Sequence, residues 1–209
     1  MKFVQKEFSY TIEEKKSRFI SYLFPYSNFD EVMKRLREEH PKAVHFVYAY
    51  RYLNEFEQIV ENSSDDGEPK GTSGKPTLAV LSGADIVNSA VVIVRYFGGT
   101  KLGTGGLVRA YSNSANEVIK ISEFKEYKKL IIKLLEIDYN ELSQLEYILN
   151  QENIKIVSKD FDMNVKLKIE LTNEEFESLK PLLSRNIKII SGVIYEKNIY
   201  SFTTCFLCS

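Results

Sequence analysis

The spacing of apolar and polar residues predicts strands and helices along most of the chain. The expected elements of the first part are two extended stretches within 8–25, a helix over 28–40 with Asn28 as its N-cap, a strand pair over 43–52 and 56–61, a short helix near Pro76, a strand over 89–97 and a helix over 107–119. The strand over 89–97 contains the continuous apolar run Val91 to Val94, which is typical of a strand buried on both faces. We assign residues 1–125 to an N-terminal domain.

A second pattern follows, in which strand, helix, strand pair, helix and strand succeed one another. The expected elements are a strand over 128–137, a helix over 140–153, a hairpin of 154–161 and 165–171, a helix opened by the capping box Thr172 to Glu175, and a strand over 187–195. The βαββαβ order is that of the ferredoxin-like arrangement. The sequence therefore predicts an α+β protein with a second domain over residues 126–209.

Composition and charge narrow the choice of partners. The chain is 44% hydrophobic and carries a net charge of -1, so any anionic partner must be met by a local patch. No apolar run approaches the ~18 residues needed to cross a bilayer, and the polar N-terminus has no stretch of signal-peptide length. We expect a cytoplasmic protein with no membrane partner. Cys205 and Cys208 form a Cys-x-x-Cys without the setting of a redox or zinc motif, and we interpret them as incidental thiols.

Glycine is concentrated in one segment, since nine of the ten glycines lie between Gly67 and Gly106. Eight of these nine fall in two loops, over 65–76 and 95–109, and the second loop joins a buried strand to a helix. A helix start offers unpaired backbone N–H groups, and glycine lets an anion approach them. From Pro69 to Tyr111 there are five basic residues and one acid, so the segment has the charge of an anion-binding patch.

These observations predict an anion- or nucleic-acid-binding surface on the two loops. The residues expected to form it are Lys70, Gly71, Thr72, Gly74, Lys75, Arg95, Tyr96, Gly98, Gly99, Thr100, Lys101, Gly103, Thr104, Gly105, Gly106 and Arg109. The loops match neither the P-loop nor the dinucleotide-binding glycine pattern. The alternative is that the glycines serve tight turns and helix–strand packing.

The first loop also carries three acids, Asp65, Asp66 and Glu68. They could hold Mg²⁺ and, with Lys70 and Lys75, position a phosphate. The simpler interpretation is a solvated turn in which the acids pair with nearby lysines, because three acids in one loop seldom complete a metal site. We therefore expect no metal or cofactor, with Mg²⁺ as the alternative.

Catalytic groups are sparse in this segment. His45 could act as a general base, but the sequence offers it no partner nucleophile, and a structural role is the simpler interpretation. The sequence therefore favours a binding protein over an enzyme.

Three stretches together resemble the YigZ/IMPACT family: 16–20 (Lys-Ser-Arg-Phe-Ile), the first loop over 65–76, and Arg95 to Tyr111. The resemblance covers residues 1 to about 122, and the tail looks like the C-terminal domain of bacterial members. It implies an N-terminal domain like the second domain of a small-subunit ribosomal protein and a C-terminal domain like domain V of elongation factor G. It also implies a role in regulating translation, best described for eukaryotic members, which restrain an amino-acid-starvation kinase through its activator.

Two functional hypotheses follow. In the first, the protein is a non-enzymatic regulator of translation or of a stress response. It then binds RNA, the ribosome or a translation-associated protein through the basic glycine-rich loops. In the second, it is a metal-assisted enzyme acting on a phosphorylated small molecule or nucleotide, with the three acids of the first loop as ligands.

Overall fold

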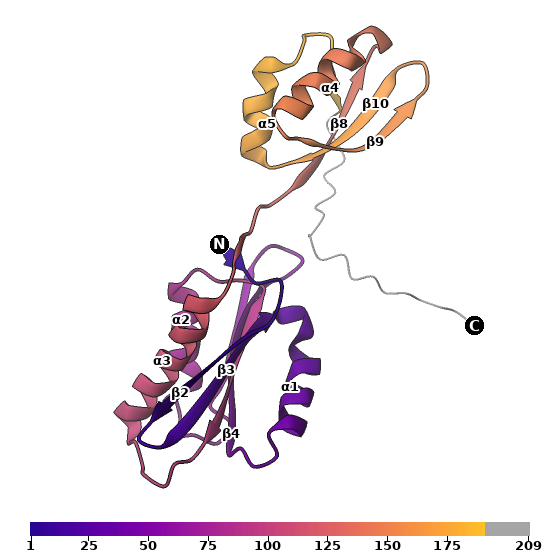
Figure 1. The fold of residues 1–209 in the computed structure, drawn as a ribbon. Coiled ribbons are helices and arrows are strands. Elements are labelled where there is room, and N and C mark those ends of the chain that lie inside the picture. The colour runs from indigo at the N-terminus through magenta and orange to yellow at the C-terminus, as the bar shows by residue number, and fades with distance from the viewer. Residues whose placement is uncertain (191–209) are drawn as a thin grey trace, which may run out of the picture. The chain divides into compact units, whose positions relative to one another are not determined.

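The computed structural model describes residues 1–190 of the chain. The chain divides into two compact units, Met1–Tyr127 and a second that begins at Lys128 (Figure 1). The break falls two residues beyond the boundary expected after residue 125. Helices and strands occur in both units, and the predicted α+β class is confirmed. None of the helices within residues 1–190 has the length and apolarity that a membrane span requires.

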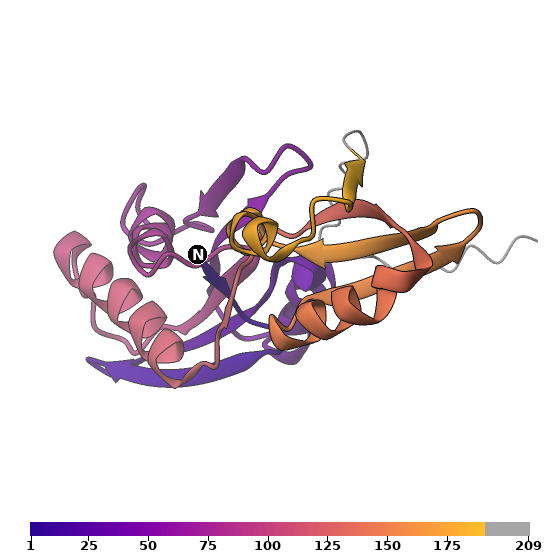
Figure 2. The same cartoon turned by 90° about the horizontal axis from the view of Figure 1, so that it is seen from above.

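A five-stranded antiparallel sheet forms the centre of the first unit. Its strands are β2 (Phe8–Glu14), β3 (Ser17–Pro25), β4 (His45–Leu53), β5 (Ile59–Ser64) and β6 (Ser89–Tyr96). The spatial order is β2-β3-β6-β4-β5, so β6 lies in the middle of the sheet. Figure 2 shows the indigo β2 at one edge of this sheet. Two short strands, β1 (Lys2–Phe3) and β7 (Lys125–Glu126), pair separately.

Helices cover both faces of this sheet (Figure 1). Helix α1 (Phe29–Glu39) packs on one face, and α2 (Gly74–Gly83) and α3 (Thr104–Ile121) pack on the other. Asn28 occupies the N-cap of α1 as predicted, but its side chain makes no capping hydrogen bond, because a 3-10 turn over Tyr26–Asn28 leads directly into the helix.

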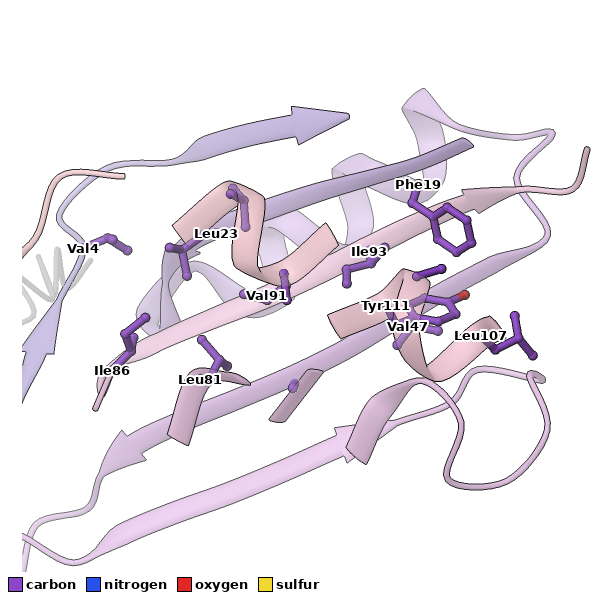
Figure 3. Packing of buried hydrophobic residues seen from close by; sticks show 14 residues of the cluster. Val4, Phe19, Leu23, Val47, Leu81, Ile86, Val91, Ile93, Leu107 and Tyr111 are labelled. Carbon is purple, nitrogen blue, oxygen red and sulfur yellow. The ribbon is translucent and has the colours of Figure 1, made fainter. Parts of the chain in front are cut away.

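The middle strand β6 supplies both cores. Val91 and Ile93 face α2 and α3, where they join Phe19, Val47 and other residues of the cluster drawn in Figure 3. Ala90, Val92 and Val94 point to the opposite face of the sheet, toward α1. Every residue from Ser89 to Arg95 is buried, which confirms the prediction made from the apolar run.

Strand β5 lies further along the chain than the sequence indicated. It was expected over 56–61 and spans Ile59–Ser64. The cause is a turn that uses residues 54–58: Asn54 Oδ1 accepts hydrogen bonds from the backbone N–H groups of Phe56 and Gln58, both at 2.9 Å. A short polar side chain that bonds its own backbone competes with strand pairing, so the hairpin turn moves the strand start forward.

The second unit has the predicted βαββαβ order. Its elements are β8 (Ile131–Ile137), α4 (Leu142–Gln151), β9 (Lys155–Phe161), β10 (Val165–Leu171), α5 (Asn173–Leu179) and β11 (Lys188–Ile190). The antiparallel order β11-β8-β10-β9 is ferredoxin-like. The capping box at Thr172 is confirmed, with bonds in both directions between Thr172 and Glu175. The last strand was expected over 187–195, and its second half lies outside the described residues, as do Cys205 and Cys208.

Candidate functional site

The first glycine-rich loop is folded around the carboxylate of Asp65. This carboxylate accepts hydrogen bonds from the backbone N–H groups of Gly71 (2.7 Å), Ser73 (3.1 Å) and Gly74 (2.8 Å), and from the Ser73 hydroxyl (2.7 Å). Burial alone would raise the pKa of Asp65, but these hydrogen bonds outweigh it and hold the pKa below its ordinary value. Asp65 thus places an internal anion at the start of α2, where a bound anion would otherwise sit.

The other two acids of this loop have different partners. Asp66 Oδ2 accepts the backbone N–H of Phe46 at 2.6 Å, and its Oδ1 lies 3.4 Å from the Arg37 guanidinium. Glu68 is buried, paired with Arg95 and bonded by the Tyr111 hydroxyl at 2.8 Å. The three carboxylates are therefore engaged separately. No group of three His, Cys, Asp or Glu side chains within residues 1–190 is placed to hold a metal.

Arg95 was expected on the binding surface, and the structure places it inside the protein. Its side chain is 6% exposed and forms an ion pair with Glu68, and its guanidinium lies 5.3 Å from the ring centre of Phe19. The reason is its position on β6, the strand buried on both faces. The positive charge of Arg95 is therefore neutralised within the fold and links β6 to the first loop.

His45 belongs to the same buried cluster. Its Nδ1 lies 2.7 Å from the carbonyl oxygen of Asp66, and its Nε2 lies 3.8 Å from Glu68 Oε1. Burial raises the pKa of Tyr111, so its hydroxyl stays protonated and donates to Glu68. The arrangement is that of a packed polar cluster joining β4, α3 and the first loop.

Several other expected site residues also face inward. Thr72 donates its hydroxyl to Pro69 O at 2.7 Å, and a Cβ on Gly74 would lie 2.8 Å from the backbone of Ser64. The Tyr96 hydroxyl is 2.9 Å from His40 Nδ1, on the α1 side of the sheet. On the first loop, the two lysines at 70 and 75 remain exposed.

The second glycine-rich loop packs on the hairpin turn between β2 and β3. The N–H of Gly98 donates to Ser17 Oγ at 3.1 Å, and a Cβ at Gly98 would lie 2.0 Å from the backbone of Lys16. Gly99 and Gly103 have open space around them but positive φ angles of +85° and +73°, which glycine adopts most readily. The glycines thus serve close packing at one position and backbone conformation at two others.

Gly98→Ala is expected to destabilise the N-terminal unit by about 2–3 kcal/mol, because the hairpin backbone must move to admit the new methyl group. Gly83→Ala is the matched control: nothing lies within 4 Å of its Cβ, so its effect should stay within about 1 kcal/mol. Urea denaturation of both variants is the measurement. Equal stabilities of the two variants would contradict the packing role of Gly98.

Helix α3, unlike α2, has no side chain that caps its start. Its N-cap is Gly103, and its first turn contains no acid. Beside this helix start lies a groove of about 350 Å³. The groove is lined by Glu14, Lys15, Leu102, Gly106, Arg109, Ala110 and Asn113. Of these, only Gly106 and Arg109 were among the expected site residues. The adjacent lysines at the hairpin turn, Lys15 and Lys16, were the sequence signal that could have added the hairpin to the site.

Two exposed cations, Lys15 and Arg109, line this groove together with one exposed acid, Glu14, and Lys16 and Lys101 are the chain neighbours of lining residues. Lys15, Lys16, Lys101 and Arg109 are exposed, and none of them has an ion-pair partner among residues 1–190. We call these four side chains, with the exposed residues Gly99, Thr100, Gly103, Thr104 and Gly105, the α3 surface. It brings together the hairpin and the second loop, which are about 80 residues apart in sequence.

Comparison with known proteins agrees with this architecture. The Impact N-terminal domain model matches residues 15–119, and a domain of unknown function (DUF1949) matches residues 135–185. An "IMPACT family member" of Haemophilus influenzae is 34% identical and covers 82% of this chain and 85% of its own. "IMPACT family member YigZ" of Escherichia coli is 36% identical over 76% of this chain and 79% of its own.

A solved structure described as a hypothetical protein matches both units. It covers 90% of this chain and 95% of its own, at 31% identity and a TM-score of 0.57. The family matches include the turn between β2 and β3 and both glycine-rich loops, and a second match lies in the ferredoxin-like unit. The chain belongs to the IMPACT family.

Proposed function

We propose that this protein is a non-enzymatic regulator that binds a negatively charged partner of the translation apparatus through the α3 surface. The observation that carries the proposal is a group of exposed cations, without ion-pair partners among residues 1–190, near the start of α3, where the N-cap is a glycine. Anions are stabilised at such a helix start by free N–H groups and by the helix dipole. RNA, the ribosome or an acidic translation-associated protein would supply that charge.

The contrast between the two loops supports the choice of surface. Both loops lead into a helix, but the start of α2 is already occupied by Asp65, while the first turn of α3 has no acid. The carboxylate of Asp65 therefore offsets part of the positive charge that Lys70, Lys75 and the helix dipole place near the start of α2. Lys101 and Arg109 remain available to a partner at the second.

Membership of the IMPACT family supports the translational part of the proposal, because regulation of translation is the role that the resemblance to this family implies. The metal-assisted alternative receives less support, because the oxygens of Asp65, Asp66 and Glu68 already accept hydrogen bonds or ion pairs from protein groups. A metal would have to displace those partners before it could bind.

Co-sedimentation with ribosomes over a salt series tests the proposal. We expect pelleting of the wild-type protein to weaken steeply with salt, and Lys101→Ala/Arg109→Ala to lower the log–log salt slope by about 1–2. The matched control is Lys34→Ala/Lys42→Ala, which removes two exposed charges elsewhere on the same unit and should behave as wild type. Arg95 is left unchanged because it is buried.

Two outcomes would overturn the proposal. One is a complete lack of pelleting at low salt. The other is pelleting that neither salt nor the Lys101→Ala/Arg109→Ala change reduces relative to the control variant. Either result would turn attention to an uncharged surface or to the small-molecule enzyme.

A further inference from the structure

Phe97 is a large aromatic side chain at an unusual place in the fold. It directly follows β6, in which every residue from Ser89 to Arg95 is buried. The side chain of Phe97, in contrast, is 49% exposed. The guanidinium of Arg95 lies 5.8 Å from the centre of the ring. Single exposed aromatic rings are common on protein surfaces, so what distinguishes Phe97 is its position at the start of the second glycine-rich loop, four residues before the exposed Lys101.

The backbone at Phe97 is held on both sides, which fixes the base of the ring. Before it, Tyr96 bonds His40 and lies under the guanidinium of Arg18, 4.5 Å from the ring centre. After it, Gly98 is bonded to Ser17 and packed against the hairpin backbone. Few rotatable bonds therefore remain to be ordered when a planar group stacks on the ring, and little conformational entropy is lost on binding.

The cations of the α3 surface begin within a few residues of this ring. Lys101 follows four residues later, and Lys15 and Lys16 lie on the hairpin against which Gly98 packs. An exposed aromatic ring beside unpaired cations and glycine backbone is the combination that binds single-stranded nucleic acid: bases stack on the ring and the cations follow the phosphates. In a duplex the base faces are already stacked on one another, and an acidic protein offers no base to stack.

We propose that the charged partner of the α3 surface is single-stranded RNA and that Phe97 is its stacking platform. This inference rests on the proposed function and makes it more specific. Lys101 and Arg109 would contact phosphates, which sets affinity and salt dependence without reading sequence. Phe97 would add affinity that salt does not change, because stacking releases no counterions.

Fluorescence anisotropy with a labelled 12-nucleotide oligouridine, which has no secondary structure, tests this. Phe97→Ala is expected to weaken binding by about 5- to 150-fold, the range measured for loss of one aromatic stacking partner. The slope of log affinity against log salt should stay unchanged. Lys101→Ala should instead lower that slope by about 0.7, the value for one phosphate contact on a single strand.

Matched variants keep the result interpretable. Phe97→Tyr should retain wild-type binding, because it preserves the ring. Phe56→Ala removes an aromatic side chain that is 72% exposed on the β4–β5 turn, and it should bind as wild type. Circular dichroism of all variants checks folding, and loss of binding in Phe97→Tyr as well as Phe97→Ala would count against stacking.

The inference and the proposed function fail in different ways. If Phe97→Ala binds the oligomer as wild type does, or if a 12-base-pair RNA duplex or a polyglutamate peptide binds at least as tightly as the single strand, the inference is overturned. Salt-sensitive ribosome pelleting that depends on Lys101 and Arg109 would leave the broader proposal standing in that case. Absence of both oligomer binding and pelleting would overturn both.

Discussion

Glu68→Ala is expected to lower the free energy of unfolding of the N-terminal unit by about 3–5 kcal/mol, which is the usual cost of leaving one member of a buried ion pair alone. Glu68 and Arg95 have side chains that are 3% and 6% exposed, so water cannot replace the lost carboxylate. The Tyr111 hydroxyl would lose its acceptor in the same step. Chemical denaturation followed by circular dichroism measures the change.

Two further variants separate the ion pair from its surroundings. Arg95→Met is expected to be destabilising by a similar amount, because it leaves Glu68 charged and buried. The double variant Glu68→Leu/Arg95→Met should recover much of the loss, since no buried charge remains unpaired. Glu38→Ala, at an exposed position of α1, is the control and should change stability by less than about 0.5 kcal/mol. Additive losses in the double variant would contradict the pairing.

Asp65→Ala is expected to cost about 2–3 kcal/mol at neutral pH, because it removes the acceptor of four hydrogen bonds at the start of α2. The loss should also depend on pH. The pKa of Asp65 is lowered in the folded protein, so the folded state favours the ionised carboxylate. Its contribution is fully present above the ordinary value of about 4 and is lost as the pH falls through the lowered pKa.

The measurement is the free energy of unfolding of wild type and Asp65→Asn between pH 7 and pH 2. The two curves should be well separated at pH 7 and converge in acid, because the asparagine cannot ionise. A constant difference across this range would show that the charge of Asp65 does not hold the loop.

Mg²⁺ tests separately whether Asp65 binds a metal. If Asp65 were a metal ligand, Mg²⁺ would raise the melting temperature of wild type and not of Asp65→Asn.

Both predictions concern side chains that resembled surface or metal-binding groups in the sequence. In the structure they hold the first loop against the sheet, with Asp65 binding the loop to α2 and Glu68 binding it to β6. Glu68 also accepts a hydrogen bond from Tyr111, so the first loop is linked to α3 as well. Stability measurements and binding measurements should accordingly separate, with Asp65 and Glu68 affecting the first and Lys101, Arg109 and Phe97 the second.

Much of the fold follows from local sequence. The apolar run Val91 to Val94 predicted a buried strand because any sheet that contains it must cover both of its faces. The capping box at Thr172 and the order of elements predicted the ferredoxin-like unit, since caps and hydrophobic periods act over a few residues. The glycine-rich loops and their flanking residues were also enough to indicate the family.

The tertiary structure decided which charges of the two loops are exposed. Arg95 and Lys101 look alike in the sequence, but Arg95 pairs with Glu68, 27 residues away, and only the folded sheet brings the two together. The sequence indicated a helix after the second loop, expected over 107–119, and the structure begins it earlier, at Thr104. The occupation of the other helix start by Asp65 depended on loop geometry. Lys15 joins the surface because Gly98 packs on the hairpin that carries this lysine. Gly98 bonds Ser17 of that hairpin across a separation of 81 residues. Burial and pairing are decided by contacts between distant segments, so the sequence indicated the candidate segment and the packing decided which of its residues are exposed.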